Sequence, residues 1–256
     1  MNRIEKAFSG GKAFIPFITA GDPSIEVTEE LVMQMAKAGA DLIELGIPFS
    51  DPAAEGPTIQ AADVRALAEG TTTDQIFELV KRIRKEVDVP IALMTYVNPV
   101  FSYGTDDFMR TCKQVGVDAV IVPDVPFEER DEIKPYCEKH GVVYISMIAP
   151  TSKARIERIA REAEGFIYCV SSLGVTGVRS RLELDAESMI RKVKDIKDIP
   201  CAIGFGISTP EQAKTMADIS DGVIIGSAIV EIIGQYGKDC VKPVTEYVKR
   251  MIDAIR

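Results

Sequence analysis

Two carboxylates in the first quarter of the chain carry the strongest chemical signal. Glu44 lies inside the short apolar run 42–45, which has the pattern of a strand. Glutamate is depleted in strands, and a buried carboxylate is costly unless something uses or pairs it. Glu55 stands at the far end of the loop that follows this run. If the loop folds back over the strand end, both carboxylates face one pocket, although pairing of Glu44 with a buried donor is the simpler alternative.

Glycine-rich motifs follow two later apolar runs. Residues 204–208 read G-F-G-I-S and residues 226–230 read G-S-A-I-V. Glycines let backbone N–H groups approach an anion, and a helix that begins near Ser227 directs its positive end to the same place. Either motif alone can be ordinary turn chemistry. Together, after the seventh and eighth predicted strands, they predict the phosphate site that is usual in β/α barrels.

A third motif, S-S-L-G-V-T-G-V-R, occupies residues 171–179. The plain interpretation is a flexible surface loop. Its position after the sixth predicted strand allows Gly177 to join the phosphate cradle and Thr176 to hydrogen bond to Asp51 of the loop after Glu44. Such a lid excludes water from a site. Asp51 can equally form an Asx turn before the proline that follows it, and the two roles are compatible.

Aromatic side chains stand at several predicted strand ends. Tyr96 and Tyr168 can pack there or orient a substrate through their hydroxyls. Phe17 and Phe205 are most simply core residues at the end of a barrel, but an aromatic substrate would need such walls. The single histidine, His140, stands at a predicted helix end, where a capping role is favoured over catalysis.

The missing residue types narrow the chemistry. The sequence has one histidine and no Cys/His cluster, so we expect no catalytic metal. No lysine stands at the end of a predicted strand, and no Ser-His pair is available, which disfavours Schiff-base and acyl-transfer chemistry. Two carboxylates and a phosphate cradle remain. They can transfer protons, and they can break a carbon–carbon bond only if the substrate carries its own electron sink.

Compact apolar runs alternate with longer amphipathic stretches along the whole chain. Continuous apolar runs are typical of parallel strands covered on both faces. Eight such units predict a (β/α)8 TIM barrel, one domain over residues 1–256, with a short extra helix over 2–9. The predicted strands are 13–19, 42–45, 91–95, 119–122, 142–147, 166–170, 202–204 and 222–225. The predicted helices are 29–38, 73–87, 106–115, 128–140, 153–162, 186–196, 210–217 and 241–255.

Two connections are unusually long, 46–70 after the second strand and 171–185 after the sixth. Both lie on the C-terminal face of a barrel, where active sites are found. Long loops at that face are usually lids or binding elements.

Composition limits the partners. The chain of 256 residues has a net charge of −9, which argues against nucleic acid or an anionic membrane as the main partner. Its five cysteines form no C-x-x-C pair and are interpreted as reduced, buried thiols of a cytoplasmic protein. No signal peptide or membrane span is expected.

Several long motifs, in order, resemble the tryptophan synthase alpha chain over essentially the whole sequence. They are F-I-T-A-G-D-P from Phe17, E-L-G-I-P-F-S-D-P from Glu44, E-G-P-T-I-Q from Glu55, G-V-T-G from Gly174, and the two late glycine motifs. The resemblance implies reversible retro-aldol cleavage of indole-3-glycerol phosphate to indole and glyceraldehyde 3-phosphate. The indole ring, protonated at C3, would be the electron sink.

The resemblance also implies roles for individual residues. Glu44 would be the general acid and base, and Glu55, where the family usually has aspartate, would accept a hydrogen bond from the indole N–H. The expected indole pocket comprises Phe17, Met94, Tyr96, Tyr168 and Phe205, the expected phosphate ligands are Gly177, Gly206, Gly226 and Ser227, and Asp51 and Thr176 would link the lids.

A partner follows from the same resemblance. The family works in an alpha2beta2 heterotetramer with a beta chain that holds pyridoxal phosphate, whereas this chain would need no cofactor. The implied contact surface is the loop after Glu44 together with residues 98–104, N-P-V-F-S-Y-G. Three alternatives stay open: a stand-alone lyase that releases indole, a non-catalytic sensor of a phosphorylated metabolite, and a phosphosugar isomerase. The isomerase is disfavoured because no lysine or histidine is placed to polarise a carbonyl.

Overall fold

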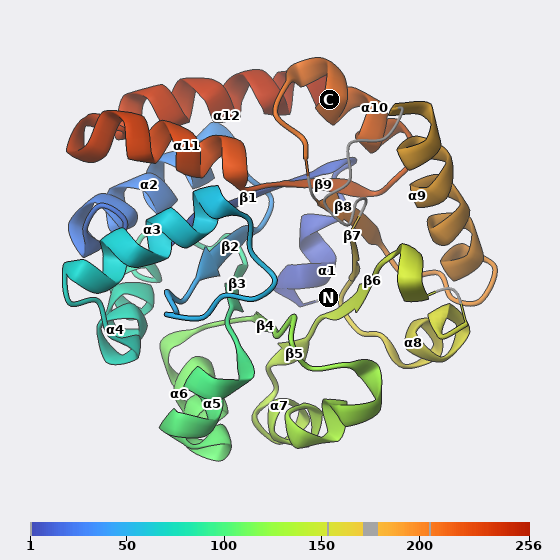
Figure 1. The fold of residues 1–256 in the computed structure, drawn as a ribbon, viewed down its shortest axis with the longest axis horizontal. Coiled ribbons are helices and arrows are strands. Elements are labelled where there is room, and N and C mark those ends of the chain that lie inside the picture. Colours follow the sequence, from blue (N-terminus) through green and yellow to red (C-terminus); the bar gives the residue numbers. More distant parts are fainter. Residues whose placement is uncertain (1, 153, 171–178, 205) are drawn as a thin grey trace.

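The computed structural model describes residues 2–152, 154–170, 179–204 and 206–256, without the side chains of 179–184. Its strands form one parallel sheet in the order β5-β4-β3-β2-β1-β9-β8-β7-β6. The sheet curves into a ring with the helices outside it (Figure 1). The predicted TIM barrel is thereby confirmed.

The fifth barrel strand is divided. The sequence predicts one strand over 142–147, whereas the structure has β5 (Val143–Tyr144) and β6 (Ser146–Ile148). β5 pairs with β4 and β6 pairs with β7, so the two outermost strands of the sheet adjoin along the chain. Ile145, between them, donates its N–H to the carbonyl of Val120 at 2.9 Å. The junction between β5 and β6, called the seam below, therefore closes the barrel by chain connectivity, because β5 and β6 do not pair with each other.

The other strands match the sequence pattern within a residue or two. They are β1 (Ala13–Thr19), β2 (Ile43–Gly46), β3 (Ile91–Met94), β4 (Ala119–Ile121), β7 (Ile167–Val170), β8 (Cys201–Gly204) and β9 (Gly222–Ile225). The α-helices are α1 (Arg3–Ala7), α2 (Ile25–Ala38), α3 (Pro57–Ala68), α4 (Thr73–Ile83), α5 (Val97–Tyr103), α6 (Thr105–Val115), α7 (Lys134–His140), α8 (Ile156–Glu162), α9 (Arg179–Lys194), α10 (Pro210–Asp218), α11 (Ser227–Tyr236) and α12 (Val241–Ile255). Short 3-10 helices cover Phe127–Glu132 (η1), Pro150–Ser152 (η2) and Gly237–Asp239 (η3).

Three predicted segments are wrong in detail. The long connection 46–70 contains α3, which begins with Pro57 at a position where a missing N–H costs nothing. The single helix predicted over 128–140 is η1 followed by α7, because Pro135 cannot donate within a continuous helix. The connection 171–185 is helical from Arg179, the first residue of α9.

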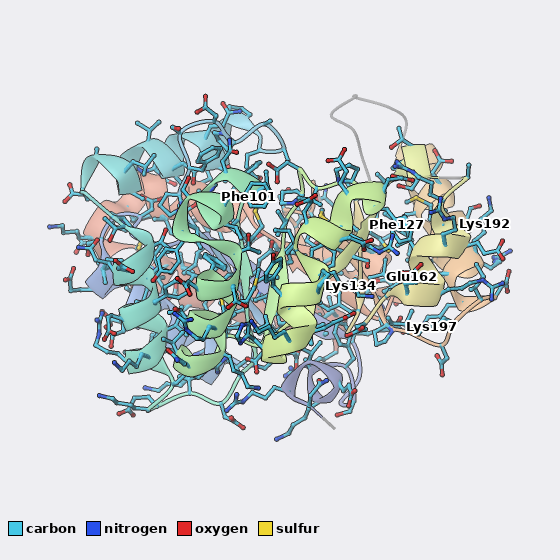
Figure 2. All side chains as sticks on the ribbon, turned by 90° about the horizontal axis from the view of Figure 1, so that it is seen from below. Phe101, Phe127, Lys134, Glu162, Lys192 and Lys197 are labelled. Atoms are coloured by element: carbon cyan, nitrogen blue, oxygen red, sulfur yellow. The ribbon has the colours of Figure 1, made fainter. Side chains whose placement is uncertain are left out.

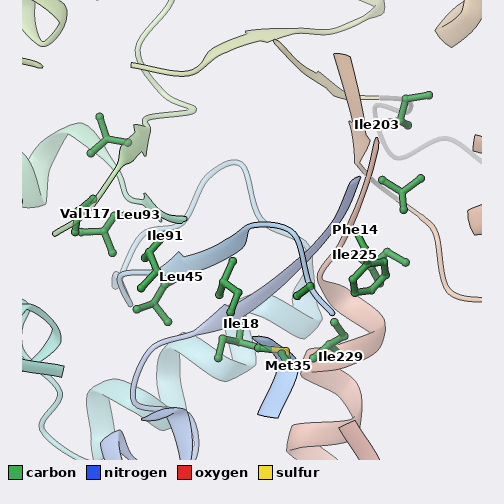
Figure 3. Packing of buried hydrophobic residues seen from close by; sticks show 14 of the residues in the cluster. Phe14, Ile18, Met35, Leu45, Ile91, Leu93, Val117, Ile203, Ile225 and Ile229 are labelled. Carbon is green, nitrogen blue, oxygen red and sulfur yellow. The ribbon is translucent and has the colours of Figure 1, made fainter. Parts of the chain in front are cut away.

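The main core lies between the strands and the helices. Phe14, Ile18 and Leu45 belong to one buried cluster with Met35 of α2 and Ile229 of α11, and Figure 3 shows Ile18 beside Met35 and Leu45 beside Ile91. A second cluster of buried side chains fills the inside of the ring, where small residues such as Ala92 and Ala202 leave room for larger ones. The five cysteines are free and buried. The packed interior holds the strand ends in fixed positions, which is what a site at the barrel mouth requires.

The end of the barrel opposite the mouth is plugged by α1. Ile4 and Ala7 are buried there, and the Phe8 ring lies 5.3 Å from that of Phe166. Arg3 fastens the helix through a 2.7 Å hydrogen bond to Asp88. Figure 2 shows α1 at the end opposite the labelled Phe101 and Phe127. No helix in the described part of the chain is long and apolar enough to cross a membrane.

Candidate active site

The mouth of the barrel holds a cavity of about 920 Å³. Its walls come from strand ends on every side of the ring and from the segment before α3. Its lining includes Glu44 of β2, Tyr168 of β7, Glu55, Ile59 of α3 and Phe127 of η1. This volume lies within the range of roughly 300–1,000 Å³ that is usual for small-molecule sites.

Glu44 is held on β2 facing into the ring, beside Phe17 in the parallel register. Its side chain is 2% exposed, and its Oε2 atom has no hydrogen-bond partner among the described residues. Burial raises the pKa of Glu44 to about 8, and the nearby Glu55 carboxylate adds to the increase. A carboxyl group with that pKa can both give and take a proton near neutral pH.

Glu55 ends the turn that precedes α3. Burial raises its pKa to about 7, against the lowering effect of a hydrogen bond from Tyr96. The Tyr96 hydroxyl lies 3.5 Å from Glu55 Oε1 and accepts the Ala54 N–H at 3.0 Å. Phe49 stacks on the Tyr96 ring with 5.4 Å between centroids. Tyr96 therefore fixes both the backbone and the carboxyl group at this side of the cavity.

Helix α3 roofs this side of the cavity. Ile59 and Ala62 pack with Phe17 and Val230, so the helix rests on β1 and α11. Figure 1 shows α3 beside α11 across the end of the ring. Arg65 anchors the helix by donating from Nε and Nη2 to Asp22 at 2.8 and 2.7 Å. The sequence did not predict this helix, because residues 46–70 were interpreted as a long connection.

The part of the cavity wall at the start of α11 is suited to an anion. Gly206, Gly226 and Ser227 line it, and α11 begins at Ser227 with no side-chain cap. The first N–H groups of a helix have no intrahelical partner and carry its positive end. Gly206 has a φ of 74°, a conformation that glycine adopts without strain. This side can therefore bind a phosphate through backbone N–H groups alone.

Most of the residues singled out in the sequence meet at this cavity. Those that line it are Phe17, Glu44, Glu55, Met94, Tyr168, Gly206, Gly226 and Ser227. Tyr96 reaches it through Glu55, whereas Asp51 is exposed and accepts a 2.7 Å hydrogen bond from Ser50. Thr176, Gly177 and Phe205 lie outside the described residues. The structure adds Ile59 and Met147 as lining residues. The helical periodicity of α3 and the alternation of side chains along β6 would have indicated them if both elements had been predicted correctly.

No cluster of three or more His, Cys, Asp or Glu side chains that could hold a metal ion occurs in the described part of the chain. His140 is far from the cavity lining. It ends α7 before Gly141, and its Nε2 lies 2.9 Å from Asp106 Oδ1.

The fold and the site define a TIM-barrel protein whose mouth holds two buried carboxyl groups and the uncapped start of a helix. The family model described as "Tryptophan synthase alpha chain" matches residues 5–256. An alpha chain from Lacticaseibacillus casei is 48% identical over 255 residues, covering 100% of this chain and 96% of that one. One from Thermoanaerobacter is 49% identical over 240 residues, covering 92% of each chain.

Solved structures agree. A Legionella pneumophila tryptophan synthase alpha subunit superposes with a TM-score of 0.90 at 38% identity, covering 100% of this chain and 98% of that one. A chain of the Pyrococcus furiosus tryptophan synthase complex gives a TM-score of 0.86 at 33% identity, covering 95% and 98%. The chain therefore belongs to the tryptophan synthase alpha chain family, lyases of tryptophan biosynthesis. The family expected from the sequence motifs is confirmed.

Proposed function

We propose that this chain cleaves indole-3-glycerol phosphate reversibly to indole and glyceraldehyde 3-phosphate, with Glu44 as the acid and base. The main support for this proposal is the buried Glu44 carboxyl group, which has one oxygen without a hydrogen-bond partner among the described residues and a pKa raised to about 8. A group of this kind exchanges protons with a substrate more readily than one already engaged in an ion pair.

The proposed reaction balances without a metal or a covalent intermediate. Protonated Glu44 gives its proton to indole C3, and the ring becomes a cation that can accept electrons. The hydroxyl group next to the bond loses its proton to the carboxylate, and a C=O bond forms there. The carbon–carbon bond breaks as its electrons return to the ring, which releases indole and the aldehyde. Glu44 ends protonated, ready for another cycle.

Glu55 is proposed to accept a hydrogen bond from the indole N–H, for which it must be ionised. Its longer side chain replaces the family's usual aspartate, and Tyr96 holds it in position. The ring would lie among Phe17, Met94, Tyr168 and, from outside the described residues, Phe205. The Tyr168 hydroxyl is buried close to Gly204, whose missing side chain leaves room for it.

The substrate phosphate is assigned to Gly206, Gly226 and Ser227, at the start of α11. Gly177 would complete this cradle, and Thr176 would bond to Asp51 when the lid closes. The exposed position of Asp51 on the loop before α3 is compatible with such a contact.

A pyridoxal-phosphate beta chain in a cytoplasmic alpha2beta2 complex is the proposed partner, and it would receive the indole. The Pyrococcus furiosus relative was solved as a "tryptophan synthase complex". On this chain, Phe101 of α5 is 47% exposed and Val64 of α3 is 67% exposed. Both belong to segments that the sequence motifs placed at the partner surface. This chain itself would need no cofactor.

The test is indole release from indole-3-glycerol phosphate by the purified chain, with and without a beta chain. We expect slow release alone, a large rise with the partner, and a loss of roughly 10²- to 10⁴-fold in Glu44→Gln. Glu78→Gln is the matched control, because Glu78 lies on the surface of α4 and pairs with Lys81. Fast release without a partner would favour a stand-alone lyase, and full activity in Glu44→Gln would refute the acid and base assignment.

A further inference from the structure

The cavity at the mouth of the barrel extends through the seam. Its wall includes every residue from Tyr144 to Ala149. Side chains alternate across a strand, and here Ile145 and Met147 belong to the cluster inside the ring, whereas Tyr144 and Ile148 belong to the core between strands and helices. A cavity that is lined by both sets reaches from the inside of the ring to the layer outside it.

The strand pairing explains this opening. β4 pairs with β5 as far as Tyr144, and Ile145 then donates its N–H to the carbonyl of Val120 at 2.9 Å. Beyond that point β6 pairs with β7 alone, and in the described structure no backbone hydrogen bond joins residues 121–127 to residues 146–149. Both of these segments line the cavity. β5 packs against α7 and β6 against α8, so the gap leads to the space beneath these two helices (Figure 1).

We call this extension of the cavity the seam branch. The residues that define it are Phe127, Arg130, Tyr144, Ile148, Arg155 and Ile159. Apart from the two arginines, their side chains are aliphatic or aromatic, and those of Ile148 and Ile159 are only 1% and 3% exposed. A pocket with mostly apolar walls and a few polar groups is typical of small-molecule sites. The seam branch can therefore shield an apolar ring or chain from water.

Arg130 of η1 offers the seam branch a hydrogen-bond donor that is not in use. Its Nη1 donates to the carbonyl of Phe127 at 2.8 Å, its Cζ lies 3.9 Å from the centroid of that ring, and its Nη2 pairs with Glu162. Its Nε is buried and has no hydrogen-bond partner among the described residues, because Asp131 Oδ1 is 3.9 Å away. A buried donor without a partner is costly, and an acceptor on a ligand would remove that cost.

Arg155, at the start of α8, adds a second positive charge. It is 38% exposed and donates from Nη1 to Glu128 Oε2 at 3.0 Å, its one hydrogen bond to the described residues. Glu128 and Glu162, the acidic partners of the two arginines, do not line the cavity. In the described lining of the seam branch and of the gap that leads to it, Asp124 is the one carboxylate, and it is engaged by the Val97 N–H. The walls therefore favour an anion.

We propose that the seam branch is a second ligand site, which takes a small anion with an apolar ring or chain, such as an aromatic carboxylate. The apolar part lies against Ile148 and Ile159, and the acidic group accepts hydrogen bonds from Arg130 Nε and from Arg155. Such bonds between guanidinium and carboxylate groups are charge-assisted. The occupant lies on the outer face of β6, so the seam branch and the indole pocket can be filled together.

The test uses 2-naphthoate as the probe and 2-naphthalenemethanol as a neutral ligand with the same ring. The full chain carries ¹³C-labelled isoleucine methyl groups, and the signals of Ile148 and Ile159 are assigned with Ile148→Val and Ile159→Val. The indole pocket is first saturated with indole-3-propanol phosphate, an analogue of the proposed substrate without its hydroxyl groups. Titration of the methyl signals then gives the Kd of each naphthalene ligand.

Arg155→Gln removes one of the two charges, and Arg158→Gln is its matched control. Arg158 lies on the first turn of α8, is 63% exposed and also faces Glu128, at 4.0 Å, but it does not line the cavity. With 2-naphthoate we expect saturable shifts of both methyl signals in the wild type. Binding should weaken by roughly 3- to 10-fold when the alcohol replaces the acid or when Arg155→Gln replaces the wild type, and Arg158→Gln should leave it unchanged.

Three results would overturn the inference. The first is the absence of saturable shifts at Ile148 and Ile159, and the second is equal affinity of Arg155→Gln and the wild type for 2-naphthoate. The third is a set of shifts that appears only while the indole pocket is empty, because it would place the probe in that pocket. Cleavage of indole-3-glycerol phosphate is not measured in this experiment, so none of these results bears on the proposed function.

Discussion

Arg65 and Asp22 form a two-pronged ion pair that joins α3 to the segment after β1. The side chain of Asp22 is fully buried, whereas that of Arg65 is 38% exposed. Planar guanidinium and carboxylate groups match in this geometry, and both hydrogen bonds are charge-assisted. The ion pair holds α3 over the cavity, because Arg65 is on the same helix as the lining residue Ile59, and this helix begins two residues after Glu55.

Replacing Arg65 should therefore cost both stability and activity. Arg65→Ala leaves the buried Asp22 carboxylate unpaired, and we expect a loss of about 2 kcal/mol, below the fully buried range because the arginine is partly solvated. Urea unfolding measures this loss. Lys81→Ala, which breaks an exposed pair with Glu78, is the control and should cost under about 1 kcal/mol. Equal losses of unfolding free energy in the two variants would show that the ion pair between Arg65 and Asp22 stabilises the fold no more than an exposed pair does.

Glu44 should limit stability at neutral and alkaline pH. Its folded-state pKa of about 8 lies above the ordinary glutamate pKa of 4.5, so the fold favours the protonated form. That stabilisation is fully present below about pH 4.5 and is lost as pH rises through about 8. Glu44→Gln should therefore match the wild type near pH 4 and exceed it by on the order of 4 kcal/mol near pH 8. Unfolding curves across this range test the sign, and a constant difference would contradict it.

Gly46 should be required for the position of the Phe17 ring. A Cβ atom at Gly46 would lie 2.7 Å from Cζ of Phe17, closer than carbon atoms can approach. Gly46→Ala should cost about 1–3 kcal/mol by overpacking, and it should raise KM as the ring moves into the indole pocket. The double variant with Phe17→Leu should recover part of the stability. Additive effects in the double-mutant cycle would argue against the contact.

The sequence predicted the parts of the fold that depend on local pattern. The apolar run around Glu44 and the helix start at Ser227 are encoded by neighbouring residues, so both were placed correctly. Helix α3 was missed because the segment before it is rich in proline and because its buried residues, Ile59, Ala62, Asp63 and Ala66, include only one large apolar side chain.

Missing α3 also concealed Asp63. A loop aspartate gives no reason to expect burial, whereas on α3 this residue is only 5% exposed. The division of the fifth strand depends on its pairing with β4 and β7 on either side. The residue pattern within 142–147 contains no information on that pairing. The lid contact between Thr176 and Asp51 stays a prediction.

The seam between β5 and β6 divides the barrel into two consecutive half-sheets, residues 1–144 and 146–256, whose described strands pair with each other only through β1 and β9. The first half carries Glu44 and Glu55, and the second carries Gly226 and Ser227. The proposed substrate would contact both halves, because its ring would lie among Phe17 and Met94 of the first half and Tyr168 of the second. Binding of such a substrate would oppose separation of the two half-sheets. The barrel would then be most rigid when the substrate is bound.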